Sequence, residues 1–274
     1  MTEQQQPDSN RPTPDVAEAP PGPRYPTVWL WVEDWFVPHI RRRINPAAGK
    51  GLSWDPAWWR YPEVVARFLA LHAAWEEATA ATAPTSASAM STWWISHLEP
   101  HLRIIFDGET GPMSLAAEGA AFTGHPPLQT LPVPDTVKHQ HETDAIAALQ
   151  GLAPLFPNVW DWVDGWFVKV IRRKLNPAAG KGLSWDPAWW RYPEVIARFQ
   201  ALHAAWEFSR ASQSPSAMSI WWVSHLDSHL RIILDGDTGP MSLAAPDSVF
   251  AGHPPLGTTP LPDAVKRQLA PAPE

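Results

Sequence analysis

Two pairs of histidines have the residue type and spacing that could hold a metal ion. His97 and His101 lie in MSTWWISHLEPHL, and His225 and His229 lie in MSIWWVSHLDSHL. On a helix this spacing places both imidazoles over one point, as in zinc proteases. A zinc protease also needs a glutamate directly after the first histidine, and both copies have leucine there. The pattern therefore indicates half of a metal site and does not fit that class of enzyme.

The alternative is that these histidines belong to a buried core. Along the predicted helix, His97 and His101 project from the middle of an apolar stripe rather than from the polar side. A buried imidazole must be hydrogen-bonded, and tryptophan N–H groups, carboxylates or backbone carbonyls are suitable partners. We favour this interpretation and expect no cofactor. Zinc or another divalent metal, with a third ligand from His72, Glu76 or His125, is the alternative.

Other motifs with a chemical meaning are incomplete. DGDTGPM places Asp235 and Asp237 like the start of a calcium loop, but Pro246 stands where such a loop needs a bidentate glutamate. NPAAGKGLS lacks the leading glycine and the following serine or threonine of a phosphate-binding loop. The chain has no cysteine, which excludes disulfides, thiolate metal sites and a cysteine nucleophile.

A basic run could bind a nucleic acid. The phosphate-binding candidates are Arg41, Arg42 and Arg43 in the first half of the chain and Arg172, Arg173 and Lys174 in the second. Tryptophans near them could stack on bases. The net charge of −7 opposes this at long range, and a solvated helix end explains the cations equally well. DNA binding is therefore a second alternative.

The chain is a tandem duplication. NPAAGKGLSWDPAWWRYPEV occurs at 45–64 and again, unchanged, at 176–195. Positions differ by 131 residues up to a short deletion near Ser209–Ser216 and by 128 after it, as Met90 and Met218 show. We divide the chain into a disordered tail at 1–24, a first copy at 25–140, a linker at 141–154, a second copy at 155–268 and a tail at 269–274.

Each copy is predicted to hold about three helices. The spacing of apolar residues, and the proline and glycine residues that interrupt helices, predict helices over 27–44 and 62–77 and a third from Met90 to about Phe106. Arg41–Arg43 would then complement the dipole of the first helix. Pro100 predicts a kink in the first copy only, because Ser228 replaces it in the second. The fold class is all-α: two tandem small helical domains with irregular proline-rich extensions.

The 18 tryptophans indicate which parts of each copy form the core and which could form a binding surface. All 18 occupy matched positions in the two copies, and most follow helical spacing, which is typical of core packing. Leu30 and Leu69 become Asp161 and Gln200, which predicts solvent-facing positions. The loops at 45–59 and 176–190 are the predicted partner surface, where exposed tryptophans could act as hot spots. Its candidates are Lys50, Trp54, Trp58, Trp59, Lys181, Trp185, Trp189 and Trp190.

The motifs WDPAWWRYPEV, HAAWE and MSxWWxSHLxxHL resemble an actinobacterial domain-of-unknown-function family (domain of unknown function 4913), present here as two tandem copies. Such domains are common on plasmids, phages and integrative conjugative elements. The family has no assigned activity, so Trp58, Trp59, Trp93, Trp94, His97 and His101 match its motif without gaining roles. The resemblance implies an accessory role in a mobile element.

We therefore expect a non-enzymatic, helical protein-interaction module. Its two copies would pack as a pseudo-dimer or present like surfaces to a protein partner, which raises avidity. A metal-dependent hydrolase or metal-binding domain is the alternative, and a DNA-binding accessory protein is the second. A secretory signal and an apolar run of membrane-spanning length are both missing from the sequence, so we expect a cytoplasmic protein without membrane contact.

Overall fold

The computed structural model describes residues 22–45, 47–81, 88–116, 122, 124–140, 153–176, 178–244, 250 and 252–254. Most of the two predicted tails and of the predicted linker lies outside these residues. Within the described part the fold is all-α and contains no strand. Isolated bridges join Leu52 to Asp107 and Leu183 to Asp235. None of the described helices is long and apolar enough to cross a bilayer.

Both copies contain the same three helical rods. In the first copy they are α1 (Val28–Trp31), η1 (Val32–Phe36) and α2 (Val37–His39); α3 (Pro62–Ala80), preceded by η2 (Trp58–Arg60); and α4 (Ala89–Thr92), η4 (Trp93–Leu98) and α5 (Glu99–Ile105). A short helix, α6 (Asp135–Gln140), follows. The second copy repeats them as α7 (Val159–Trp162), η6 (Val163–Phe167) and α8 (Val168–Val170); η7 (Trp189–Arg191) and α9 (Pro193–Ala211); and α10 (Ala217–Ile220), η8 (Trp221–Leu226) and α11 (Asp227–Ile233).

Local chemistry explains where these helices begin. The Thr27 hydroxyl accepts a hydrogen bond from the Leu30 N–H, and Asn158 Oδ1 accepts one from the Asp161 N–H. Pro62 starts α3, where its missing N–H costs nothing. Glu76 of α3 accepts hydrogen bonds from the backbone of Arg24 and Tyr25, which ties the start of the chain to the main helix.

The first helix is shorter than predicted. It ends at His39, and Ile40 is extended, with φ −93° and ψ 93°. This turn buries the Ile40 side chain in the core, and Ile171 does the same in the second copy. Arg41–Arg43 therefore lie beyond the helix, and the predicted extension to residue 44 is wrong.

The third helix contains a π-helical segment in both copies, η4 and η8. Because the second copy has Ser228 in place of Pro100, the proline does not cause this irregularity, and the predicted difference between the copies is wrong. Pro100 instead occupies the first turn of α5, directly after the widened turn.

Tryptophans fill the core of each copy. Trp31 is fully buried, 5.5 Å from Trp35 and edge-on to Trp93, measured between ring centroids. The indole N–H of Trp93 donates to the Leu71 carbonyl, and Trp221 donates to Leu202 in the same way. Leu30 and Leu69 are exposed, as predicted.

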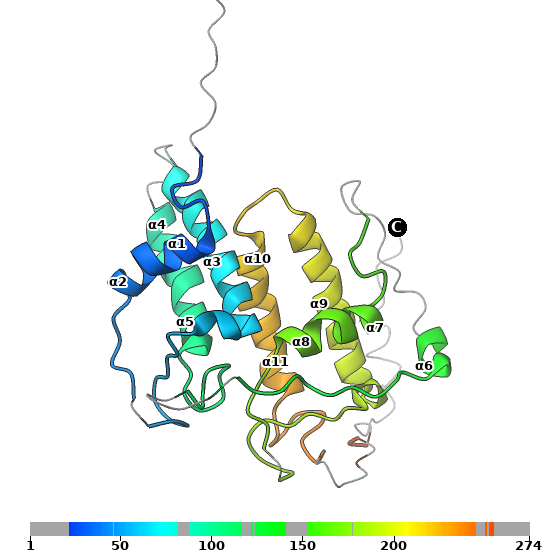
Figure 1. The fold of residues 1–274 in the computed structure, drawn as a ribbon. Coiled ribbons are helices and arrows are strands. Elements are labelled where there is room, and N and C mark those ends of the chain that lie inside the picture. The colour runs from blue at the N-terminus through cyan, green and yellow to red at the C-terminus, as the bar shows by residue number, and fades with distance from the viewer. Residues whose placement is uncertain are drawn as a thin grey trace, which may run out of the picture.

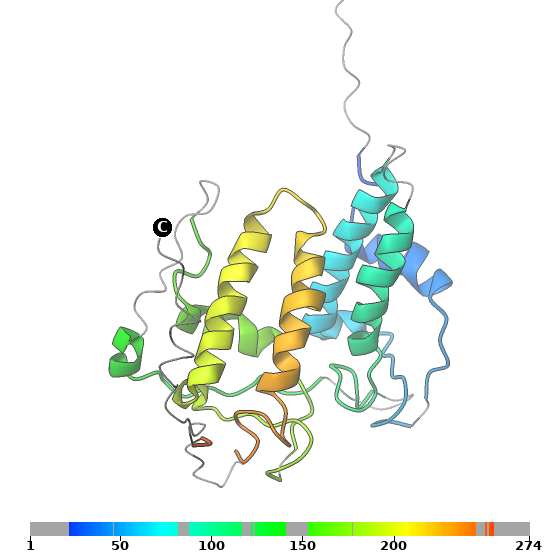
Figure 2. The same cartoon turned by 180° about the vertical axis from the view of Figure 1, so that it is seen from behind.

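The long helices form one row, in the order α4–α5, α3, α10–α11, α9 (Figures 1 and 2). The helices α1–α2 and α7–α8 cross one side of this row (Figure 1). The third helix of the second copy therefore packs against the main helix of the first. Third and main helices alternate along the row. The two copies therefore follow each other in the same order and are not related by a two-fold axis.

Candidate binding surface

A buried network of charges joins the two copies. Arg67 of α3 donates to both carboxylate oxygens of Asp227 of α11, at 3.1 and 2.5 Å, and to Glu63 at 3.0 Å. Glu63 also accepts hydrogen bonds from Arg173 of the second copy. Burial alone would raise the pKa of the Glu63 carboxyl, but Arg173 and Arg67 hold it below its ordinary value. Each buried charge thus has a partner of opposite sign.

The predicted metal-binding histidines of the first copy lie beside this network. His97 Nδ1 and His101 Nε2 are 2.8 and 3.1 Å from the hydroxyl of Ser219 in the second copy. Arg67 Nη1 donates to His101 Nδ1, so His101 Nε2 carries the proton and donates to Ser219. Burial lowers the pKa of His101 well below its ordinary value, and Arg67 lowers it further.

This arrangement does not fit a metal ion. A guanidinium occupies one side of His101, and the described residues contain no group of three or more histidine, cysteine, aspartate or glutamate side chains able to hold a metal. The proposed third ligands are engaged elsewhere: His72 with Glu76, and His125 with Ser114.

Of the four predicted histidines only His101 is buried, and for another reason than predicted. The second copy covers His101, whereas its counterpart His229 is half-buried and His225 is exposed. The expected burial within each copy's own three-helix core is therefore wrong. Trp222 is likewise buried by the other copy. It is 1% exposed beneath the Arg67 guanidinium, whose central carbon is 4.5 Å from the ring. Its counterpart Trp94 is 37% exposed.

The loop tryptophans were expected at the surface, and most are not. Trp59 is 59% exposed, but Trp58 and Trp189 are buried because their rings pack on the main helix of their copy. Trp185 is also buried, and its indole N–H bonds to the Gln129 carbonyl of the first copy. Trp54 and Trp190 are half-buried. Lys50 and Lys181 are exposed.

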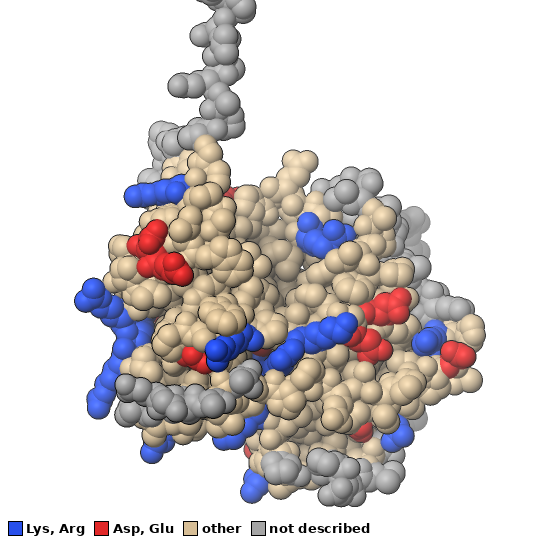
Figure 3. Space-filling view, in the orientation of Figure 1, with Lys and Arg blue, Asp and Glu red and all other residues tan. Residues whose placement is uncertain are grey.

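The two basic runs have different environments. Arg41, Arg42 and Arg43 are exposed, and Arg42 pairs with Glu99 at 3.2 Å. In the second copy, Arg172 is half-buried and Lys174 exposed, while Arg173 is buried in the network described above. On the face shown in Figure 3, lysine and arginine lie at several separate places, with acidic residues between them. Because Arg173 is buried, the six candidates do not form one exposed patch.

An extended segment of the first copy lies on the second. We call residues 126–133 the strap. The Leu128 N–H donates to the Val168 carbonyl at 3.2 Å, and the Leu131 N–H donates to the Pro187 carbonyl at 2.8 Å. The indole N–H of Trp185 donates to the Gln129 carbonyl at 2.6 Å. Leu128 and Val133 are buried in the core of the second copy.

The face that the strap covers is open on the first copy. Trp160 and Val168 beneath the strap are 7% and 6% exposed, whereas their counterparts Trp29 and Val37 are each 48% exposed. We call the surface formed by Trp29, Val37, Trp54 and Pro56 the open face. Sequence reasoning missed it, although the apolar residues spaced between prolines in PPLQTLPVP were a signal that this segment binds a surface.

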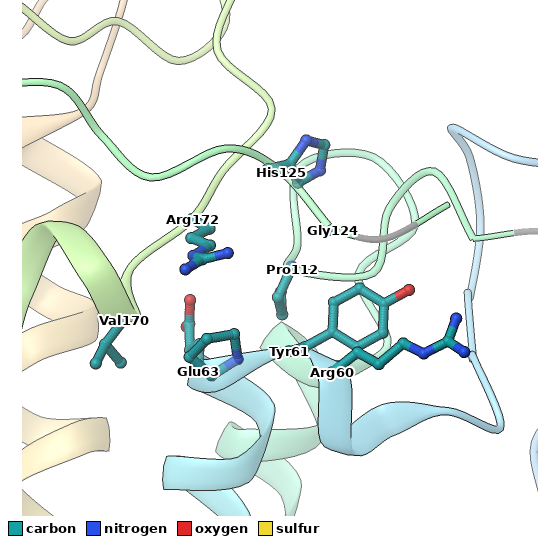
Figure 4. A pocket seen from close by; sticks show the side chains of 9 residues that line it. Arg60, Tyr61, Glu63, Pro112, Gly124, His125, Val170 and Arg172 are labelled. Carbon is teal, nitrogen blue, oxygen red and sulfur yellow. The ribbon is translucent and has the colours of Figure 1, made fainter. Parts of the chain in front are cut away.

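Several cavities lie at the junction of the copies. The one in Figure 4, between Tyr61 and His125 of the first copy and Arg172 of the second, has a volume of about 10 Å³, which holds one water molecule at most. A larger one of about 740 Å³ lies along the strap beside Lys174 and Trp185. The strap is therefore held by its hydrogen bonds and by two buried side chains rather than by continuous packing.

Residues 25–134 and 156–262 each match the model of a family described as a domain of unknown function, DUF4913. Both copies belong to the DUF4913 family. No curated protein and no solved structure matches the chain. The first match ends at residue 134, directly after the strap, so the strap is part of the first DUF4913 domain although it lies on the second.

Proposed function

We propose that this protein is a non-enzymatic interaction module whose open face receives an extended, proline-rich segment of a protein partner. The observation that carries the proposal is the strap. It binds the face of the second copy that corresponds to the open face of the first. Recognition of an extended proline-rich segment by an aromatic-lined surface is a common mode, because such a segment loses little entropy on binding.

The open face has the groups that this contact needs. Three groups on the second copy bond to the strap: the carbonyls of Val168 and Pro187 and the indole N–H of Trp185. The first copy has the same residues at the matched positions, Val37, Pro56 and Trp54. Trp29 and Val37 would provide the apolar contact that Trp160 and Val168 provide for Leu128 and Val133.

A peptide with the sequence of residues 125–135, HPPLQTLPVPD, tests the proposal. Titrated into the full chain, it should bind with a roughly micromolar dissociation constant, followed by tryptophan fluorescence or NMR. Val37→Asp should weaken binding by about tenfold or more, because it places a charge in the apolar contact. Leu69→Gln is the matched control, since Leu69 is exposed elsewhere on the first copy and the second copy already has glutamine there.

Equal peptide affinity for the wild type and Val37→Asp would overturn the proposal, as would the lack of any binding. The strap itself competes weakly for the open face, because its linkage to the second copy gives that contact a high effective concentration.

We also propose that the module is a cytoplasmic accessory protein of an actinobacterial mobile element. The support is the resemblance of its tryptophan and histidine motifs to domains found on such elements. Affinity capture from host cells, with Val37→Asp as the control bait, tests this role: the partner should be lost with the variant. Recovery of the same proteins with both baits would contradict it.

A further inference from the structure

The two copies contact each other through unlike surfaces. Surface A, on the first copy, consists of Glu63, Arg67, His97 and His101. Surface B, on the second copy, consists of Arg173, Ser219, Trp222 and Asp227. Because the chain is a duplication, it carries each surface twice. The second surface A is Glu194, Arg198, His225 and His229 on the second copy, and the second surface B is Arg42, Ser91, Trp94 and Glu99 on the first.

These second surfaces are uncovered. Glu194 is exposed and Arg198 half-exposed, whereas Glu63 and Arg67 are buried. Ile95, next to Trp94, is 68% exposed, while its counterpart Val223 is half-buried. Glu194 and Arg198 lie on α9, and Trp94 and Glu99 lie on η4 and α5. These helices are at opposite ends of the row (Figure 2).

We infer that the chain associates head to tail with further copies of itself, surface A of one molecule's second copy docking on surface B of the next molecule's first copy. The inference deepens the proposed function by naming a second copy of this chain as the partner. The docking would extend the row of helices by the contact that already joins the copies within one chain.

Charge complementarity supports this pairing. In the chain, Arg67 pairs with Asp227 and Glu63 with Arg173. Between molecules, Arg198 would meet Glu99 and Glu194 would meet Arg42, so both signs are retained. Each half of the network is already formed: Arg198 is 2.7 Å from Glu194, and Arg42 is 3.2 Å from Glu99. The Ser91 hydroxyl would lie between His225 and His229, as Ser219 does between His97 and His101.

The sequence of the strap is also repeated in the second copy. PPLGTTPLPD at 254–263 closely matches PPLQTLPVPD at 126–135. Residues 255–263 lie outside the described part of the chain.

One contact would not be repeated. Glu77 accepts a hydrogen bond from the Ser216 N–H at 2.8 Å, but its counterpart on the second copy is Phe208, which is exposed and cannot accept. The contact between molecules is also not linked covalently. Association should therefore be weaker than the contact within the chain and depend on concentration. A contact between unlike surfaces produces a ring if the rotation closes and an open filament if it does not.

Sedimentation of the full chain between about 1 µM and 1 mM tests the inference. The wild type should form species larger than the 30.5 kDa chain as the concentration rises. Arg198→Glu and Glu99→Arg, each alone, should raise the concentration needed by about tenfold or more, because like charges would face each other. Mixing the two variants should restore association, and so should combining both changes in one chain.

Lys181→Glu is the control, because Lys181 is an exposed cation of the second copy that belongs to neither surface. A wild type that stays monomeric throughout, or an oligomer unaffected by both charge reversals, would overturn the inference. Peptide binding that is sensitive to Val37→Asp in a chain that stays monomeric would sink the inference and leave the proposed function standing. A chain that assembles but does not bind the peptide would overturn the proposed function and leave the inference standing.

Discussion

Matched residues of the two copies have unequal environments. Arg67 is completely buried between two carboxylates, whereas its counterpart Arg198 lies half-exposed with one carboxylate beside it. A buried cation that loses its partner leaves an uncompensated charge, while a surface ion pair contributes little. The same substitution should therefore have different effects at the two positions.

Arg67→Met should lower the free energy of unfolding by about 3–5 kcal/mol, because Asp227 would keep a buried charge without a partner and Glu63 would retain only Arg173. Arg198→Met should change it by less than about 1 kcal/mol. Urea unfolding of both variants, followed by circular dichroism, makes the comparison. Similar losses at the two positions would show that the network does not depend on the second copy.

His101 gives the protein a pH-dependent stability. Its pKa is well below the ordinary value because of burial, with further lowering by Arg67 and His97. The unfolded chain takes up a proton near pH 6.5 and the folded chain does not, so stability is complete above that pH and falls below it. One such group contributes a slope of up to about 1.4 kcal/mol per pH unit.

Urea unfolding between about pH 5.5 and 7.5 measures this slope. His101→Gln should make it shallower, since glutamine can still bond Ser219 but does not titrate. An unchanged slope in that variant would mean that other buried histidines, such as His203, account for the whole dependence.

At the scale of elements, the main helix was the most predictable part. Pro62 and the apolar spacing after it place α3 correctly, because proline fixes the first turn and the stripe fixes the buried face. The first helix was predicted too long, since nothing local signals that Ile40 turns into the core. The π-helical segments have no sequence signature that spacing rules capture.

The junction could not be predicted from the sequence. Matched residues give the same prediction in both copies, and the difference between Trp94 and Trp222 arises only from which face meets a neighbour. The strap was described as an irregular extension because an extended segment has no periodicity that names its partner. What the sequence did indicate, a helical and tryptophan-packed unit in two copies, is confirmed.

The strap should contribute measurably to the stability of the second copy. Leu128→Ala should cost about 2–4 kcal/mol, because the side chain is buried against that copy's core. Leu131→Ala, three residues away and exposed, should stay within about 0.5 kcal/mol. Urea unfolding gives the values, and a red shift of tryptophan emission in Leu128→Ala would report wetting of Trp185. Equal effects of the two substitutions would argue against the strap contact.

At the scale of the whole molecule, the two copies should behave as separable partners. Fragments 22–140 and 153–274, produced separately, should bind each other, because surface A with the strap lies on one and surface B on the other. Calorimetric titration measures the affinity, which Arg67→Met should weaken by about tenfold or more. Arg198→Met in the second fragment is the matched control. Fragments that do not recognise each other would contradict the described junction.

The π-helical turn at Trp93–Leu98 sets the rotation of α5 relative to α4. It holds one residue more than an α-helical turn needs, so its loss would rotate α5 by about 100° relative to α4. His101 would then swing away from the neighbouring copy, with every contact residue still present in the sequence. A single inserted or deleted codon in this turn would thus be enough to exchange one recognition face for another.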